Sequence, residues 1–159
     1  MIQRVQSLYY LVAMILLGTC LTGVEIYRFS TDKTYFAFNA YGFQEAINDD
    51  SATNLSNQSK PFYIIGILMV LFIFYVTMSY KKLNTQLKLA RFVSFAYLAI
   101  IIALVIFGAT GNQYFYDGNC TRELGAGFSL LVIGFPFCYL AQLGIKRDKK
   151  LLDSLNRLR

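Results

Sequence analysis

Four stretches of the chain contain no charged residue, and each is at least 20 residues long: residues 5–24, 61–80, 92–116 and 124–145. An α-helix rises about 1.5 Å per residue, so about 20 apolar residues cross a hydrocarbon layer of about 30 Å. The sequence therefore predicts an all-α membrane protein. We expect a four-transmembrane-helix bundle in one integral membrane domain over residues 1–159, with spans at about 8–27, 61–80, 91–110 and 125–144.

Charged residues sort by side once the chain is threaded back and forth through these spans. Eleven basic and two acidic residues fall on one side, and four basic and seven acidic residues on the other. Basic residues are retained on the cytoplasmic side of a membrane, so both termini are expected to be cytoplasmic. The cytoplasmic set is Arg4, Lys81, Lys82, Lys88, Arg91, Lys146, Arg147, Lys149, Lys150, Arg157 and Arg159.

The net charge of +6 raises the question of nucleic acid binding. The excess cations are confined to the membrane-adjacent face, so anionic lipid headgroups are the expected partner of Lys81, Lys82, Lys88 and Arg91 in the inner loop. A protein or ribonucleoprotein that docks on the same face is the alternative.

The C-terminal tail, residues 145–159, is predicted to form an amphipathic helix. Leu151, Leu152, Leu155 and Leu158 share one helical stripe, whereas Lys149, Asp153 and Arg157 are spaced for i,i+4 pairs on another face. Two outcomes stay open. The leucine stripe lies in the headgroup boundary of the inner leaflet, or it stands away from the membrane and contacts a protein partner.

The two predicted loops on the non-cytoplasmic side contain segments with sequence patterns typical of β-strands. Residues 34–43 are dense in aromatic side chains with period-two spacing, and an Asp-Gly turn signal at residues 117–118 separates two short predicted strands, 114–116 and 120–122. We expect a small outer β element that combines both loops. Residues 48–59 are rich in Asn, Asp and Ser, so they are predicted to form an exposed connection.

Small residues concentrate toward the outer ends of the predicted spans. Gly18 and Thr22 in the first span and Gly125 and Ser129 in the fourth are spaced as small-xxx-small pairs, which allow close helix approach. We expect spans one and four to touch there. Pro136 should kink the fourth span because it frees the carbonyl of residue 132.

Residues suited to catalysis are scarce. The chain has no histidine and no charged residue within the core of a predicted span, which argues against proton pumps, ion-coupled carriers and voltage sensors. Its three cysteines, Cys20, Cys120 and Cys138, form no CxxC motif, and Cys120 is expected to be a lone outer thiol. Residues 48–50 lack the spaced ligands of a calcium loop. We therefore expect no enzyme activity, no cofactor and no metal site.

Three segments together resemble one known family. They are the opening MIQRVQSLYYLVAMILL, the inner-loop residues Lys82, Gln86, Leu87 and Arg91, and the ending from Ile145 to Arg159. The chain resembles the uncharacterised four-helix inner-membrane family of Bacteroidota known as domain of unknown function 4293. The resemblance implies location in the bacterial inner membrane and a multi-pass topology. It implies no activity.

The leading functional hypothesis is a non-enzymatic accessory or assembly subunit of a larger inner-membrane complex, with an integral-membrane protein partner. The protein translocation and insertion machinery is one candidate host, because a basic cytoplasmic tail suits the ribosome surface as well as lipid. The alternative is a lipid-binding or small-solute transport protein that uses the region of Pro136 as its site.

Overall fold

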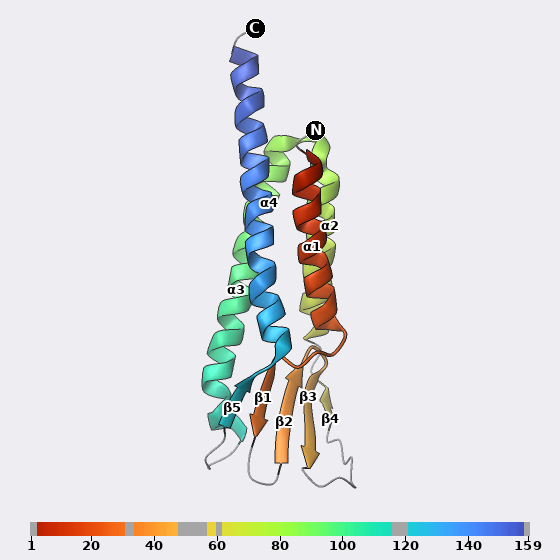
Figure 1. Cartoon of the computed structure of the whole chain (residues 1–159), viewed down its shortest axis with the longest axis vertical. Coiled ribbons are helices and arrows are strands. Elements are labelled where there is room, and N and C mark those ends of the chain that lie inside the picture. The colour runs from red at the N-terminus through yellow and green to blue at the C-terminus, as the bar shows by residue number, and fades with distance from the viewer. Residues whose placement is uncertain (1–2, 31–33, 48–56, 60–61, 116–120, 158–159) are drawn as a thin grey trace.

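The computed structural model describes residues 3–30, 34–47, 57–59, 62–115 and 121–157. Four helices lie side by side and a five-stranded antiparallel sheet covers one end of them, while both termini lie at the opposite end (Figure 1). The elements are α1 (Gln3–Leu21), β1 (Tyr27–Ser30), β2 (Thr34–Asn39), β3 (Gly42–Ile47), β4 (Asn57–Ser59), α2 (Tyr63–Met78), the 3-10 turn η1 (Ser79–Lys81), α3 (Leu83–Phe115), β5 (Thr121–Leu124) and α4 (Ala126–Arg157).

The prediction of four transmembrane helices with a small outer β element is wrong. Among the described residues, two helical segments are long and apolar enough to cross a membrane, Leu83–Thr110 and Ala126–Ser154. The apolar parts of α1 and α2, Val5–Leu21 and Tyr63–Met78, are shorter. A sheet of five strands stands where a minor element was expected.

The first predicted span fails because its last residues do not continue the helix. Gly23 has a φ of 97°, a left-handed conformation that glycine adopts readily and that stops an α-helix. The chain then enters β1, so Tyr27 lies in the sheet and not at the end of a span. The predicted span 8–27 therefore contains a helix, a turn and the first residue of a strand.

The sheet has the order β4-β3-β2-β1-β5, and each neighbouring pair is antiparallel. The segment predicted to be strand-like, residues 34–43, divides into β2 and the start of β3 around a tight turn. Asn39 pairs with Gly42, and the Asn39 Oδ1 accepts a hydrogen bond from the Tyr41 N–H at 2.9 Å. Gly42 has a φ of 129°, which favours glycine at this point.

Both outer segments contribute strands to this single sheet, but in the second segment only the predicted strand 120–122 overlaps an observed strand, β5. β1 pairs with β5 in the register Tyr27 to Leu124 and Ser30 to Thr121. Tyr114 belongs to α3, because that helix continues past the predicted span end at residue 110. Residues 48–56 and 116–120, which include Cys120 and the Asp-Gly pair, lie outside the described residues.

At the other end of the bundle, the predicted inner loop and tail are mostly helix. The turn between α2 and α3 is confined to η1 and Lys82, whose N–H donates to the Ser79 carbonyl at 3.2 Å. α3 starts at Leu83, within the predicted inner loop that runs from Lys81 to Arg91. The tail is not a separate element, because α4 runs without a break through Pro136 to Arg157.

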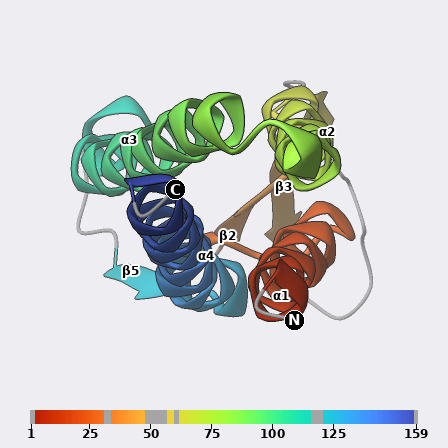
Figure 2. The same ribbon diagram turned by 90° about the horizontal axis from the view of Figure 1, so that it is seen from above.

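The core lies along the axis of the helices and continues to the inner face of the sheet. α1 packs chiefly against α4, α3 packs against the other side of α4, and α2 lies beside α1 and α3 (Figure 2). The largest fully buried side chains in the helices are Tyr10 and Tyr97, and those in the sheet are Tyr27, Phe29 and Phe38. Aromatic side chains of the strands therefore close one end of the bundle.

Candidate functional site: the basic end of the bundle and the apolar cavity

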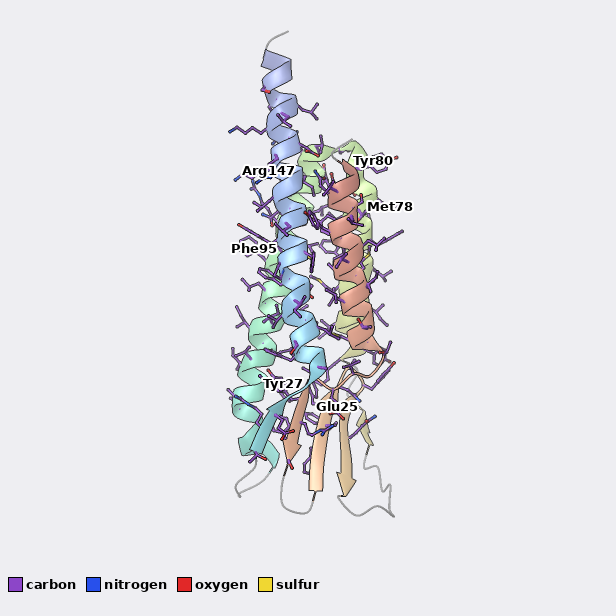
Figure 3. The ribbon with its side chains drawn as sticks, in the orientation of Figure 1. Glu25, Tyr27, Met78, Tyr80, Phe95 and Arg147 are labelled. Carbon is purple, nitrogen blue, oxygen red and sulfur yellow. The ribbon has the colours of Figure 1, made fainter. Side chains whose placement is uncertain are left out.

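The structure brings the two predicted basic elements to one end of the molecule. Lys82, Lys88 and Arg91 are exposed beside the α2–α3 turn, and Lys146 and Arg147 are exposed on α4, at the same end as both termini (Figures 1 and 3). The other members are placed as follows: Lys150 is exposed, Lys149 is half-buried, and the side chains of Arg4, Lys81, Arg157 and Arg159 lie outside the described part. We call this surface the basic end.

One helix extends beyond the basic end (Figure 1). Ile145 is fully buried in the bundle, and the Gln6 side-chain amide of α1 donates a hydrogen bond to the Asp148 carboxylate of α4. Past this contact, Leu151 and Leu152 are 52% and 46% exposed. Leu155 and Leu158 continue the stripe in sequence, but their side chains are outside the described set. We call residues 149–157 the α4 extension.

Two buried glutamines at this end were missed by the sequence reasoning. A Cβ added at Gly144 of α4 would lie 2.7 Å from the Gln6 Cγ of α1, so the two helices approach closely. The Gln86 Nε2 donates to the Val76 carbonyl at 3.3 Å across the α2–α3 turn. The available signal was helical spacing, since Gln6 lies four residues before the buried Tyr10 and Gln86 four before the buried Ala90, and a buried amide needs a partner.

The helices are also joined by tyrosines that lie against glycines. The Tyr27 hydroxyl donates to the Leu104 carbonyl at 3.1 Å. A Cβ added at Gly108 would lie 2.7 Å from the Tyr27 Cζ, so the ring packs directly on this glycine. Burial raises the pKa of the Tyr27 phenol above its ordinary value, and the positive charge of Arg122 opposes this rise. The phenol is therefore neutral at physiological pH and keeps its donor, which fastens β1 to α3.

The residues predicted to pack α1 against α4 are distributed differently. A Cβ added at Gly18 would meet no other atom within 4 Å, so no neighbouring helix packs closely there. Thr22 is exposed, and its hydroxyl donates to the Thr19 carbonyl at 2.7 Å within α1. Ser129 is also exposed. Of the four predicted residues, Gly125 makes a close approach, and it does so to the segment after α1. Its N–H donates to the Ile26 carbonyl at 3.0 Å, and a Cβ there would lie 2.1 Å from the Glu25 carbonyl oxygen. The start of α4 is thus held against the segment after α1.

Pro136 occupies an exposed position in the middle of α4. The neighbouring polar contact is made by Tyr97 of α3, whose hydroxyl donates to the Leu131 carbonyl at 3.0 Å. A Cβ added at Gly134 would lie 2.3 Å from this hydroxyl oxygen. Pro136 does not line the apolar cavity described next, which lies closer to the sheet.

The apolar cavity has a volume of about 330 Å³ and lies near the sheet end of the helices. Two helical stripes form opposite walls, and the sheet closes the end through Phe38. The lining residues are Leu17, Cys20, Leu21 and Ile26 from α1 and the segment after it, Phe38 and Ala40 from the sheet, Phe62, Ile65, Gly66 and Met69 at α2, Ile100, Ala103, Leu104 and Phe107 from α3, and Leu131 from α4. No lining side chain carries a charge.

Groups suited to reaction chemistry are sparse in the described part of the chain. No group of three or more His, Cys, Asp or Glu residues there is placed to hold a metal ion. Cys20 and Cys138 are buried thiols, and the Cys20 Sγ donates to the Gly127 carbonyl at 3.4 Å. The described residues also form a basic end with a protruding helix, and an apolar cavity.

Comparison with known families gives one match, and it covers nearly the whole chain. Residues 2–158 match the domain of unknown function DUF4293. No curated protein matches the chain significantly. The matched range includes every helix and strand described above, together with both the basic end and the cavity. The chain belongs to the DUF4293 family, a domain of unknown function.

Proposed function

We propose that this protein is a non-enzymatic accessory or assembly subunit of a larger complex in the bacterial inner membrane. In this proposal the two long helices, α3 and α4, cross the membrane with the basic end on the cytoplasmic side. The basic end then lies on the side where cations are retained.

The exposure of apolar side chains supports the membrane placement. In the most apolar windows of α3 and α4, only 22% and 28% of the residues are buried, whereas the core helix of a soluble protein would be mostly buried. Phe95 is 71% exposed and points away from the bundle (Figure 3). Leu68 and Leu71 of α2 are exposed to a similar degree. A surface this apolar needs a hydrocarbon environment or a partner.

The α4 extension is the observation that carries the subunit proposal. The helix has 32 residues and is therefore about 48 Å long, which exceeds a hydrocarbon layer of about 30 Å and the full bilayer of about 40–45 Å. A straight helix that crosses the membrane carries its end out of the headgroup region. Leu151 and Leu152 lie about 38–39 Å from the start of this helix, at the headgroup level, and their exposed side chains are open to a protein partner there.

The chemistry of the extension limits the partner. Lys149, Lys150 and the exposed leucines would fit an integral-membrane subunit whose cytoplasmic surface is apolar with an acidic rim. Anionic lipid headgroups are the partner we propose for Lys82, Lys88 and Arg91, which lie beside the turn. Among complete assemblies, the translocation and insertion machinery is one candidate host, and its bound ribosome is a further candidate contact for the basic end.

A mild-detergent pull-down with mass spectrometry tests the proposal. The full-length tagged protein should recover a stoichiometric integral-membrane partner. Leu151→Asp together with Leu152→Asp should release that partner while the bundle stays folded, because the two anions lie on the exposed apolar stripe.

Ser154→Asp together with Asn156→Asp is the matched control, since it adds the same charge to the same helix off the stripe. This variant should keep the partner. Equal recovery from both double variants would overturn the role of the stripe, and the absence of any stoichiometric partner from the unmodified protein would overturn the subunit proposal.

The second candidate function, lipid binding or small-solute transport, is favoured by a different observation, the apolar cavity. The cavity does not include Pro136, which was the predicted site. It has no charged wall, which suits an apolar ligand better than a polar solute.

A further inference from the structure

The apolar cavity has an opening between α2 and α3. Each helix lines it with residues at i, i+3, i+4 and i+7, namely residues 62, 65, 66 and 69 of the α2 side and residues 100, 103, 104 and 107 of α3. On α2, Gly66 faces α1, because a Cβ there would meet the Leu21 side chain. Ile65, which flanks the other side of that stripe, is 53% exposed, and Ala103 on α3 is exposed as well. The exposed lining residues thus border a gap between the two helices.

Aromatic contacts frame this opening at both ends. Toward the α2–α3 turn, Phe72 and Phe92 meet edge to face with ring centroids 5.5 Å apart. Toward the sheet, Phe38 contacts Phe62 at 5.2 Å and Phe107 at 4.9 Å, so one strand residue bridges the two helices. The seam between α2 and α3 is therefore closed above and below, and the cavity opens sideways between the two closures.

The wall chemistry selects an apolar ligand. Water in a buried space needs two to four polar partners, whereas apolar cavities stay dry and accept apolar molecules. The volume of about 330 Å³ is at the low end of the range of about 300–1,000 Å³ for small-molecule sites. A space of this size suits one extended chain better than a whole lipid.

The surroundings of the opening identify the source of that chain. Exposed apolar side chains on the same two helices, including Leu68, Ile102 and Ile106, continue outward from the opening. In the membrane placement proposed above, on which this inference rests, that surface faces the acyl chains of the bilayer. We propose that the cavity binds one acyl chain of a membrane phospholipid, which enters sideways between α2 and α3 while its headgroup stays at the level of the sheet.

Native mass spectrometry of the detergent-purified protein tests this proposal. The unmodified protein should retain one phospholipid, identified by its mass. Ala103→Phe places a ring in the opening and should lower lipid occupancy about tenfold. Ala99→Phe is the matched control, because Ala99 is exposed on the same helix one turn away and does not line the cavity. It should keep the lipid.

Folding and ligand identity are checked separately. Circular dichroism and thermal unfolding establish that each variant is folded, and Ala103→Leu, a smaller obstruction, decides the outcome if Ala103→Phe does not fold. Equal lipid retention by the Ala103 and Ala99 variants would overturn the site. Absence of a bound lipid, or a bound mass that is not a phospholipid, would overturn the assignment of a phospholipid acyl chain as the ligand. Partner recovery with the Leu151 and Leu152 variant tests the subunit proposal independently.

Discussion

The hydroxyl of Tyr97 on α3 donates a hydrogen bond to the carbonyl oxygen of Leu131 on α4 at 3.0 Å, and it does so over Gly134. The contact joins two helices near the middle of the bundle. It requires both a phenol on α3 and the absence of a side chain on α4. The two helices that are long enough to cross a membrane are therefore held together by a buried polar contact as well as by apolar packing.

A double-mutant cycle tests this relationship. Tyr97→Phe should destabilise the protein by about 1 kcal/mol through the lost hydrogen bond. Gly134→Ala should cost about 1–3 kcal/mol, because its Cβ would lie 2.3 Å from the Tyr97 hydroxyl oxygen. In the Tyr97→Phe background the same change should cost less, since the nearest remaining ring atom is 3.4 Å away. Thermal unfolding in detergent measures each step, and equal Gly134→Ala costs in both backgrounds would contradict the contact.

The two glycines predicted to pack α1 against α4 should respond oppositely to alanine. Gly125→Ala should lose about 2–4 kcal/mol of stability, because its Cβ would lie 2.1 Å from a backbone oxygen of Glu25, which cannot move without disturbing the Gly125 to Ile26 hydrogen bond. Gly18→Ala should raise stability by about 0.5–1 kcal/mol, since nothing lies within 4 Å of its Cβ and alanine is the better helix former. Thermal unfolding of the two variants side by side decides this, and a larger loss for Gly18→Ala would refute the packing described.

The proposed topology predicts opposite labelling at the two ends of the molecule. In a Cys120→Ser background, Glu123→Cys on the exposed strand β5 should react with a membrane-impermeant maleimide on spheroplasts. Ser154→Cys on α4 should react only after permeabilisation. The remaining native thiols, Cys20 and Cys138, are buried and should give little background. The reverse labelling pattern would show that the basic end faces outward.

The cations beside the α2–α3 turn should affect lipid retention without affecting folding. Changing Lys82, Lys88 and Arg91 to Gln removes three exposed charges, each of which contributes at most about 1 kcal/mol near an anionic surface. Co-purified phosphatidylglycerol, measured by mass spectrometry, should fall, and the unfolding temperature should stay unchanged. Lys82→Arg with Lys88→Arg keeps the charge and is the control. Unchanged lipid content in the Gln variant would remove anionic lipid as the partner of this cluster.

The sequence was informative about where helices occur and much less so about where they end. Long uncharged runs correctly indicated apolar helices, because apolar residues are needed wherever a helix faces a core or lipid. The first of these runs concealed the break at Gly23, and the strand that begins at Tyr27 follows it within three residues. An aromatic residue at the end of an apolar run is compatible with a membrane interface and with a buried strand, and only the tertiary pairing of β1 with β5 distinguishes them.

The two candidate sites differed in how far they could be predicted. Basic residues at positions 82, 88, 91, 146 and 147 were recognisable because charge pattern is visible in sequence, and the fold collects them at one end. The cavity was not recognisable. Its walls are ordinary apolar residues from four helices and a strand, and its opening depends on how α2 and α3 diverge, which no local pattern encodes.

The pairing of β1 with β5 also sets an order on biogenesis. Ser30 and Thr121, which face each other in this ladder, are 91 positions apart in the chain. During translation β1 emerges first, and α2 and α3 are both synthesised before its second neighbour exists. An unpaired strand edge is a template for pairing with another chain. A nascent chain stalled before Thr121 therefore exposes an unpaired edge of β1. The sheet can close with β5 only after α3 has been synthesised.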